Sequence, residues 1–201
     1  MYHTRATALL SLTLLAACAG AEDRPPVPDE SPDANTPQDA FWAALQDLCG
    51  DSFEGRVVES EPPDPSFDTQ QLVMHVRSCT ADSIRIPFHV GDDRSRTWVV
   101  TRTVTGLRLK HDHRHEDGSE DAVTQYGGDT RDAGTGTVQE FPADAFTAEL
   151  LPVSATNVWT LELRPGEVFR YVLRREGAER RFRAEFDLRQ PVDTPPPPWD
   201  G

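Results

Sequence analysis

The chain has 201 residues, with 34 acidic side chains, 20 lysines and arginines together, and a formal net charge of −14 at pH 7. This length allows one globular domain, and the acidic balance argues against nucleic-acid binding, which needs clustered positive charge. Apolar residues make up 37% of the chain, which excludes both an integral membrane protein and a wholly disordered chain.

The first segment, residues 1–17, is predicted to be a signal peptide. Arg5 is followed by an apolar stretch that is too short to cross a bilayer as a helix, since a crossing takes roughly 20 residues. The stretch ends in Leu15-Ala16-Ala17-Cys18, which resembles the lipobox of bacterial lipoproteins. The resemblance implies cleavage before Cys18 and acylation of its thiol and amine with several chains, palmitate among the usual ones, which together anchor a protein stably.

The residue after Cys18 is Ala19, and lipoproteins without an acidic residue at this place resemble those sorted to the outer membrane. The expected location is therefore the bacterial cell envelope, with the chain anchored to the outer membrane and facing the periplasm. The alternative is ordinary secretion with cleavage after Ala19 or Ala21.

Two proline-rich segments are predicted to flank the folded part. Residues 18–36 carry five acidic side chains and four prolines, which is typical of a disordered, partly extended tether. Residues 191–201 contain Pro191 and the run Pro195–Pro198, and they are predicted to be a disordered tail. The β-domain is expected to occupy residues 37–190.

The domain is predicted to begin with a helix over residues 37–49. Thr36 is the expected N-cap, Asp39 stands at capping-box spacing, and Gly50 ends the helix. Cys49 and Cys79 are predicted to form a disulfide, which the oxidising environment of an exported protein permits. The alternative for these two residues is a catalytic thiol.

After the helix the apolar pattern changes to a period of two, which is typical of antiparallel strands with one buried face. The segments that follow it are 52–60, 70–79, 83–90, 96–104, 107–116, 158–164, 169–173 and 182–188. The predicted fold is mainly β: an antiparallel meander closing into a barrel, or a two-sheet sandwich, with one N-terminal helix. This order of helix and meander is similar to calycin-type barrels, which implies ligand binding.

The strand over residues 107–116 is the one segment whose side chains indicate chemistry. Leu107, Leu109, His111, His113 and His115 share one face of it, and the leucines indicate that this face is turned inward.

Asp117-Gly118 is a hairpin signal that sets an expected register. In that register the opposed pairs are His115 with Glu120, His113 with Ala122, His111 with Thr124, and Leu109 with Tyr126. Thr124 and Tyr126 then extend the patch of imidazoles as a place for a ligand.

Strand geometry limits a metal site in this patch. His111 and His115 would be about 13 Å apart, so at most two of the three histidines can bind one ion. The predicted ligand set is His113, His115 and Glu120, with His111 as the remaining candidate, and zinc suits these donors. Two other interpretations stay open: the histidines extend past the core into solvent, or they form hydrogen-bonded polar lining.

Three functions follow from these features. The first is a non-catalytic, lipid-anchored envelope protein whose β-domain binds a small ligand or an envelope protein. The second is a divalent-metal-binding protein, which could be a hydrolase that uses zinc-bound water as its nucleophile. The third is a structural component of an envelope assembly.

Overall fold

The structure is a computed structural model that describes Met1 and residues 36–199. The predicted signal peptide, Cys18 and the predicted tether up to residue 35 lie outside the described residues. Among the described residues, no helix is long and apolar enough to cross a membrane.

Helix α1 (Pro37–Gln46) opens the described domain. Thr36 and Asp39 form the predicted capping box, in which each side chain accepts from the other residue's backbone N–H at 3.1 Å. The helix ends three residues before the predicted boundary, because the backbone N–H groups of Leu48 and Cys49 bond to carbonyls three residues back and tighten the chain into turns. Gly50 follows at φ +97°, in the left-handed region that glycine tolerates.

The strands within residues 36–199 form one antiparallel sheet. Their bounds are β1 (Ser52–Glu61), β2 (Leu72–His75), β3 (Ser78–Cys79), β4 (Ser83–Val90), β5 (Asp93–Thr103), β6 (Gly106–His113), β7 (Tyr126–Asp129), β8 (Val138–Pro142), β9 (Asn157–Arg164), β10 (Val168–Arg175) and β11 (Arg181–Val192). The order in the sheet is β7-β6-β5-β4-β2-β1-β11-β10-β9-β8, and β3 pairs with β4 outside this order. Two further short helices are α2 (Pro65–Asp68) and α3 (Ala145–Leu150), and Pro152–Ser154 form a 3-10 turn.

The two end strands of the sheet, β7 and β8, come close enough to make it a nearly closed barrel. The backbone N–H of Asp144, just after β8, donates to the carbonyl of Gly127 in β7 at 2.9 Å. A Cβ on Gly128 would lie only 1.8 Å from the carbonyl oxygen of Pro142, so a side chain there would push the two strands apart. The predicted mainly β fold is confirmed, as a barrel rather than a sandwich.

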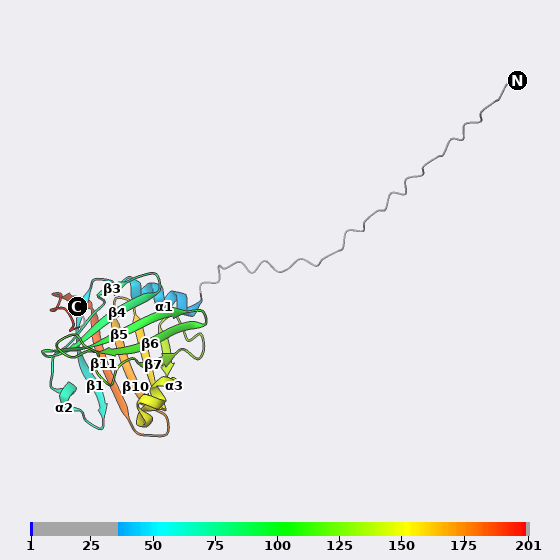
Figure 1. Cartoon of the computed structure of the whole chain (residues 1–201). Helices are drawn as coiled ribbons and strands as arrows, with labels where there is room; N and C mark the ends of the chain where they lie inside the picture. Colours follow the sequence, from blue (N-terminus) through cyan, green and yellow to red (C-terminus); the bar gives the residue numbers. More distant parts are fainter. Residues whose placement is uncertain (2–35, 200–201) are drawn as a thin grey trace. The chain divides into compact units, whose positions relative to one another are not determined.

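Helix α1 covers one end of the barrel (Figure 1). Phe41, Trp42 and Leu45 are buried in the same core as the inward side chains of the strands. Asp39 forms an ion pair with Arg102 of β5, whose guanidinium also lies 5.4 Å from the ring centroid of Trp42. The helix is therefore fixed to the barrel by apolar burial and by a cation that bridges two of its side chains.

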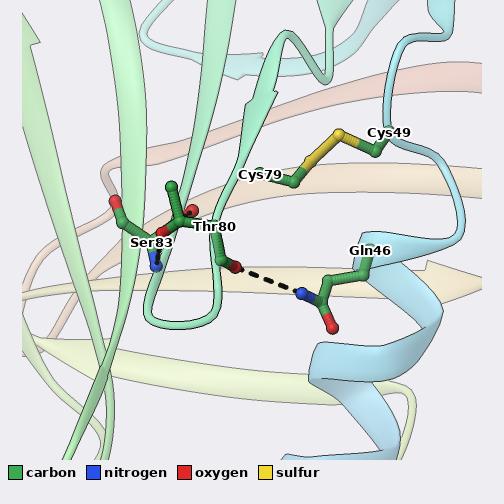
Figure 2. The surroundings of a disulfide bond; sticks show 5 residues. All are labelled: Gln46, Cys49, Cys79, Thr80 and Ser83. Atoms are coloured by element: carbon green, nitrogen blue, oxygen red, sulfur yellow. Dashed lines mark hydrogen bonds between the residues drawn. A yellow bond between two sulfur atoms is a disulfide. The ribbon is translucent and has the colours of Figure 1, made fainter.

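The predicted disulfide between Cys49 and Cys79 is present (Figure 2). It joins the turn after α1 to β3, and next to it the side-chain amide of Gln46 donates to the carbonyl of Thr80 at 3.2 Å. The turn from β3 to β4 is closed locally, since the backbone N–H of Ser83 donates to Oγ1 of Thr80 at 2.9 Å. These bonds hold the end of the helix against the sheet.

The C-terminal segment differs from the disordered tail predicted from residue 191. Strand β11 continues to Val192, and beyond it Arg94 donates from Nη1 to the carbonyl of Pro197 at 2.9 Å. The backbone N–H of Trp199 donates to the carbonyl of Arg94 at 3.2 Å. Strand β11 thus runs two residues past the predicted boundary at residue 190, and the proline run lies beside the β4–β5 hairpin.

Candidate ligand pocket at the open end of the barrel

The end of the barrel opposite α1 contains a pocket of about 280 Å³. Strand β5 runs from one end of the barrel to the other: Arg96 near its start lines the pocket, and Arg102 near its finish contacts α1. Strands β4, β5, β6, β9, β10 and β11 all contribute lining side chains, and α2, the loop before β7 and the turn after α3 complete the wall.

Aromatic side chains form the inner wall of the pocket, which we call the aromatic floor. Its members are Phe88, Trp98, Trp159, Tyr171 and Phe182. The ring of Trp98 is stacked between Phe88 and Tyr171, with centroids at 4.6 and 4.5 Å and interplanar angles of 17° and 14°. Such stacked rings present a rigid apolar surface with few torsions left to order when a ligand binds.

His111 lies at the base of the pocket and is only 3% exposed. Its Nδ1 is 3.1 Å from the carbonyl oxygen of Tyr126 and its Nε2 is 2.8 Å from the hydroxyl of Tyr171. Burial lowers the pKa of His111 to about 3, so the ring is neutral at pH 7. Since a carbonyl only accepts, Nδ1 carries the proton, and Nε2 accepts from the Tyr171 hydroxyl.

His113 lies one pleat closer to the mouth. Its Nε2 is 3.1 Å from the hydroxyl of Tyr126, whose ring stacks on His111 at 4.4 Å. Burial, and next the positive charge of Arg96, lower the pKa of His113 to about 4. Burial also raises the pKa of Tyr126 to about 12. The titratable groups of this wall are therefore neutral hydrogen-bonding groups at pH 7.

Three arginines surround the mouth of the pocket, and we call Arg96, Arg175 and Arg180 the basic rim. Arg96 is neutralised by an ion pair with Asp93 and lies over the ring of Phe67 at 5.2 Å. No aspartate or glutamate is among the described side chains that line the pocket. The mouth therefore carries net positive charge on a protein that is acidic as a whole.

The hairpin register predicted for the histidine strand is wrong. His111 pairs with Tyr126 and Leu109 with Gly128, two positions further along the second strand than predicted. The turn bond joins the N–H of Gly118 to the carbonyl of His115, and residues 121–125 bulge out before β7 begins. Within this bulge the side chain of Asp121 accepts from the N–H of Val123 at 2.7 Å, so extra residues are accommodated on one strand only.

This register also separates the predicted metal ligands. His115 is exposed, and Glu120 forms an ion pair at 3.2 Å with Arg114, which also contacts Asp112 on the face away from the pocket. Both ring nitrogens of His111 already have partners, so no lone pair remains for an ion. Within residues 36–199 no three His, Cys, Asp or Glu side chains are grouped so that they could hold a metal ion. The set of His113, His115 and Glu120 is thus not brought together.

The two residues predicted to extend the ligand patch have different places. Tyr126 lines the pocket and stacks on His111. The hydroxyl of Thr124 instead accepts from the backbone N–H of His113 at 2.8 Å and so joins the bulge to β6.

The aromatic floor and the basic rim were not predicted as parts of a site. A signal for them is present in the sequence, because Tyr171, Leu173 and Arg175 alternate on one face of β10, and Arg96 and Trp98 do so on β5. What the sequence lacks is the information that these two strands face each other across the barrel.

Comparisons with known proteins place the chain in no family. No protein-family model matches it, and neither a curated protein nor a solved structure matches it.

Proposed function

We propose that the β-domain binds a small organic ligand in the pocket and that its role is non-catalytic. The observation that carries the proposal is the pocket of about 280 Å³ with an aromatic floor and fixed polar groups. A concave, mainly apolar site with a few oriented hydrogen-bonding groups is the usual form of a small-molecule site.

The protonation of the pocket supports binding rather than catalysis. A general acid or base works best with a pKa near the working pH, whereas burial holds the pKa of His111 at about 3 and that of His113 at about 4. At pH 7 both rings stay neutral, and they serve as fixed donors and acceptors that orient a ligand.

The pocket itself can be tested with phenyl naphthylamine, a neutral probe that fluoresces when it enters an apolar site. We expect it to bind the full chain, to accept energy from Trp98 and Trp159, and to raise the melting temperature by linkage. Leu173→Trp would fill the pocket and remove this binding, because Leu173 is part of the lining.

The matched control is Val172→Trp, whose side chain leaves the same strand on the opposite face. Equal binding by the wild type and Leu173→Trp would overturn the proposed pocket. A selective loss in Leu173→Trp would support it.

We also propose that Cys18 carries the lipid that holds this domain at the periplasmic face of a bacterial outer membrane. The support is the run Leu15-Ala16-Ala17-Cys18 after a short apolar segment. Labelled palmitate should enter the full chain and be absent from Cys18→Ser in cells that express each form. Equal labelling of both forms would contradict the anchor and leave the pocket proposal intact.

A further inference from the structure

We infer that the ligand of this pocket is an organic anion, an acid with an apolar or aromatic body whose charged group binds Arg175 and Arg180. This inference rests on the proposed function and adds the chemical class of the ligand. It is carried by the place of the two guanidinium groups and by the lack of carboxylate partners around them.

Arg175 and Arg180 are held together at the mouth by the β10–β11 hairpin. The backbone N–H of Arg175 donates to the carbonyl of Arg180 at 3.1 Å, and both side chains line the pocket. Arg175 is oriented by a bond of 2.8 Å from its Nε to the side-chain oxygen of Asn157, a residue that is 4% exposed. Its remaining N–H groups are left for another acceptor.

Arg180 is bound only loosely. Its Nη1 reaches the carbonyls of Glu61 and Pro62 at 3.5 and 3.4 Å, which are long contacts to neutral acceptors. Within residues 36–199 neither Arg175 nor Arg180 has a carboxylate oxygen within 4.0 Å. Two cations therefore face the mouth without a counter-charge from the described residues.

Arginines on the outer face of β10, by contrast, have carboxylate partners. Arg170 lies between Glu162 and Glu185 at 3.1 and 2.6 Å, and Arg174 contacts two glutamates at 3.0 and 3.2 Å. The described part of this acidic chain thus supplies carboxylates to the arginines of β10 that point outward and none to the one that points into the pocket.

These contacts define what the ligand must present. A planar guanidinium binds carboxylate, sulfonate or phosphate oxygens through charge-assisted, often paired, hydrogen bonds. The apolar body of the same molecule would lie against the aromatic floor of the pocket. Neutral His111 and His113 add no opposing charge, and a cationic ligand would meet only repulsion at the rim.

The test compares two probes of one skeleton with the full chain: anilinonaphthalene sulfonate, which is an anion, and neutral phenyl naphthylamine. We expect Arg175→Gln and Arg180→Gln each to weaken the binding of the anionic probe by about tenfold, the usual effect of losing one charged hydrogen-bonding partner. Both variants should leave the affinity for the neutral probe within about twofold. Arg181→Gln is the matched control, since it removes the same charge from an exposed position next to Arg180.

The outcomes separate this inference from the proposed function. If both probes bind the wild type and neither rim variant lowers the affinity for either probe, the proposed pocket is retained and the anion inference is overturned. If neither probe binds the wild type, the proposed function fails as well. If the rim variants lose affinity for the anionic probe alone, and Arg181→Gln does not, the inference is supported.

A salt titration of the wild type gives the same answer without any variant. Added sodium chloride should weaken the binding of the sulfonate probe and leave that of the neutral probe unchanged, because salt screens the partly exposed guanidinium groups. Arg175→Lys and Arg180→Lys, which keep the charge, should retain part of the affinity for the anion and serve where a glutamine variant folds poorly. Salt-independent binding of the anion would count against the inference.

Discussion

The two ends of the barrel use the same kinds of residue in opposite ways. At the end closed by α1, Arg102 has a carboxylate partner in Asp39 and an aromatic partner in Trp42, and the apolar side chains around them are buried. At the open end, Arg175 and Arg180 line a pocket whose inner wall is the aromatic floor. The closed end therefore contributes to stability, whereas the open end places two cations beside a pocket, as the proposed ligand site requires.

The first way to test this comparison is to remove the core of the closed end. Phe41 is fully buried, so Phe41→Ala should lower the free energy of unfolding by about 3–5 kcal/mol. Urea unfolding measures this loss, while probe binding below the transition should be retained. Phe146→Ala is the control, since Phe146 is 50% exposed. A loss below about 1 kcal/mol in Phe41→Ala would show that α1 is not part of the stable unit.

The second way is to release the helix from the sheet by removing the disulfide. Cys49 and Cys79 are separated by 30 positions, and a bridge of this span is worth roughly 3–4 kcal/mol in the chain-entropy model. The double variant Cys49→Ser with Cys79→Ser should unfold at lower urea concentration by that amount. Reductant should lower the stability of the wild type equally and leave the double variant unchanged. A response of the double variant to reductant would contradict this assignment.

The open end should instead be sensitive to pH. Burial places the pKa of His111 at about 3, well below its value near 6.5 in the unfolded chain. As pH falls below 6.5 the unfolded chain takes up a proton that the folded ring does not, so folding loses about 1.4 kcal/mol per pH unit until the folded pKa is reached. Between pH 6.5 and 5 this amounts to about 2 kcal/mol for His111 alone.

His111→Gln keeps hydrogen-bonding groups and removes the titration. Its free energy of unfolding should fall less between pH 6.5 and 5 than that of the wild type, as urea unfolding at the two pH values would report. His115→Gln is the control, because His115 is exposed and lies outside the pocket. An identical pH slope in His111→Gln and the wild type would indicate that this ring is solvated in the folded protein.

The smallest effect is expected for the ion pair of the closed end. Arg102 and Asp39 have side chains that are 37% and 30% exposed, so solvent screens their attraction. Arg102→Gln should cost about 0.5–1 kcal/mol, with part of the loss due to the contact with Trp42. The loss should shrink when Asp39→Asn is already present, which a double-mutant cycle measures. Full additivity of the two changes would indicate that the pair is not coupled.

Much of the local structure could be predicted from the residues themselves. The capping box of Thr36 and Asp39 depends on residues three positions apart, and it was found where predicted. The inward direction of His111 and His113 follows from the alternation with Leu107 and Leu109, and it holds whatever the register of the hairpin.

The register itself could not be obtained in this way. Asp117-Gly118 is a good turn signal, but the bulge over residues 121–125 adds residues to one strand only. The bulge depends on side-chain bonds such as those made by Asp121 and Thr124, which a pattern of apolar residues does not record. The predicted metal site failed nearer the turn, where Glu120 pairs with Arg114 instead of His115.

By itself, the sequence determined the helix start, the alternation of the strands, the pairing of its two domain cysteines and the direction in which two histidines point. The helix start, the alternation and the direction of the histidines depend on residues close together in the chain. The pairing of the cysteines follows because the domain has only Cys49 and Cys79. Only the tertiary structure decided that Arg175 and Arg180 share a mouth with Trp98 and His111, because closing the barrel brings β10 opposite β5 and β6. Contacts between strands so far apart in the chain are set by packing and register, which no local pattern encodes.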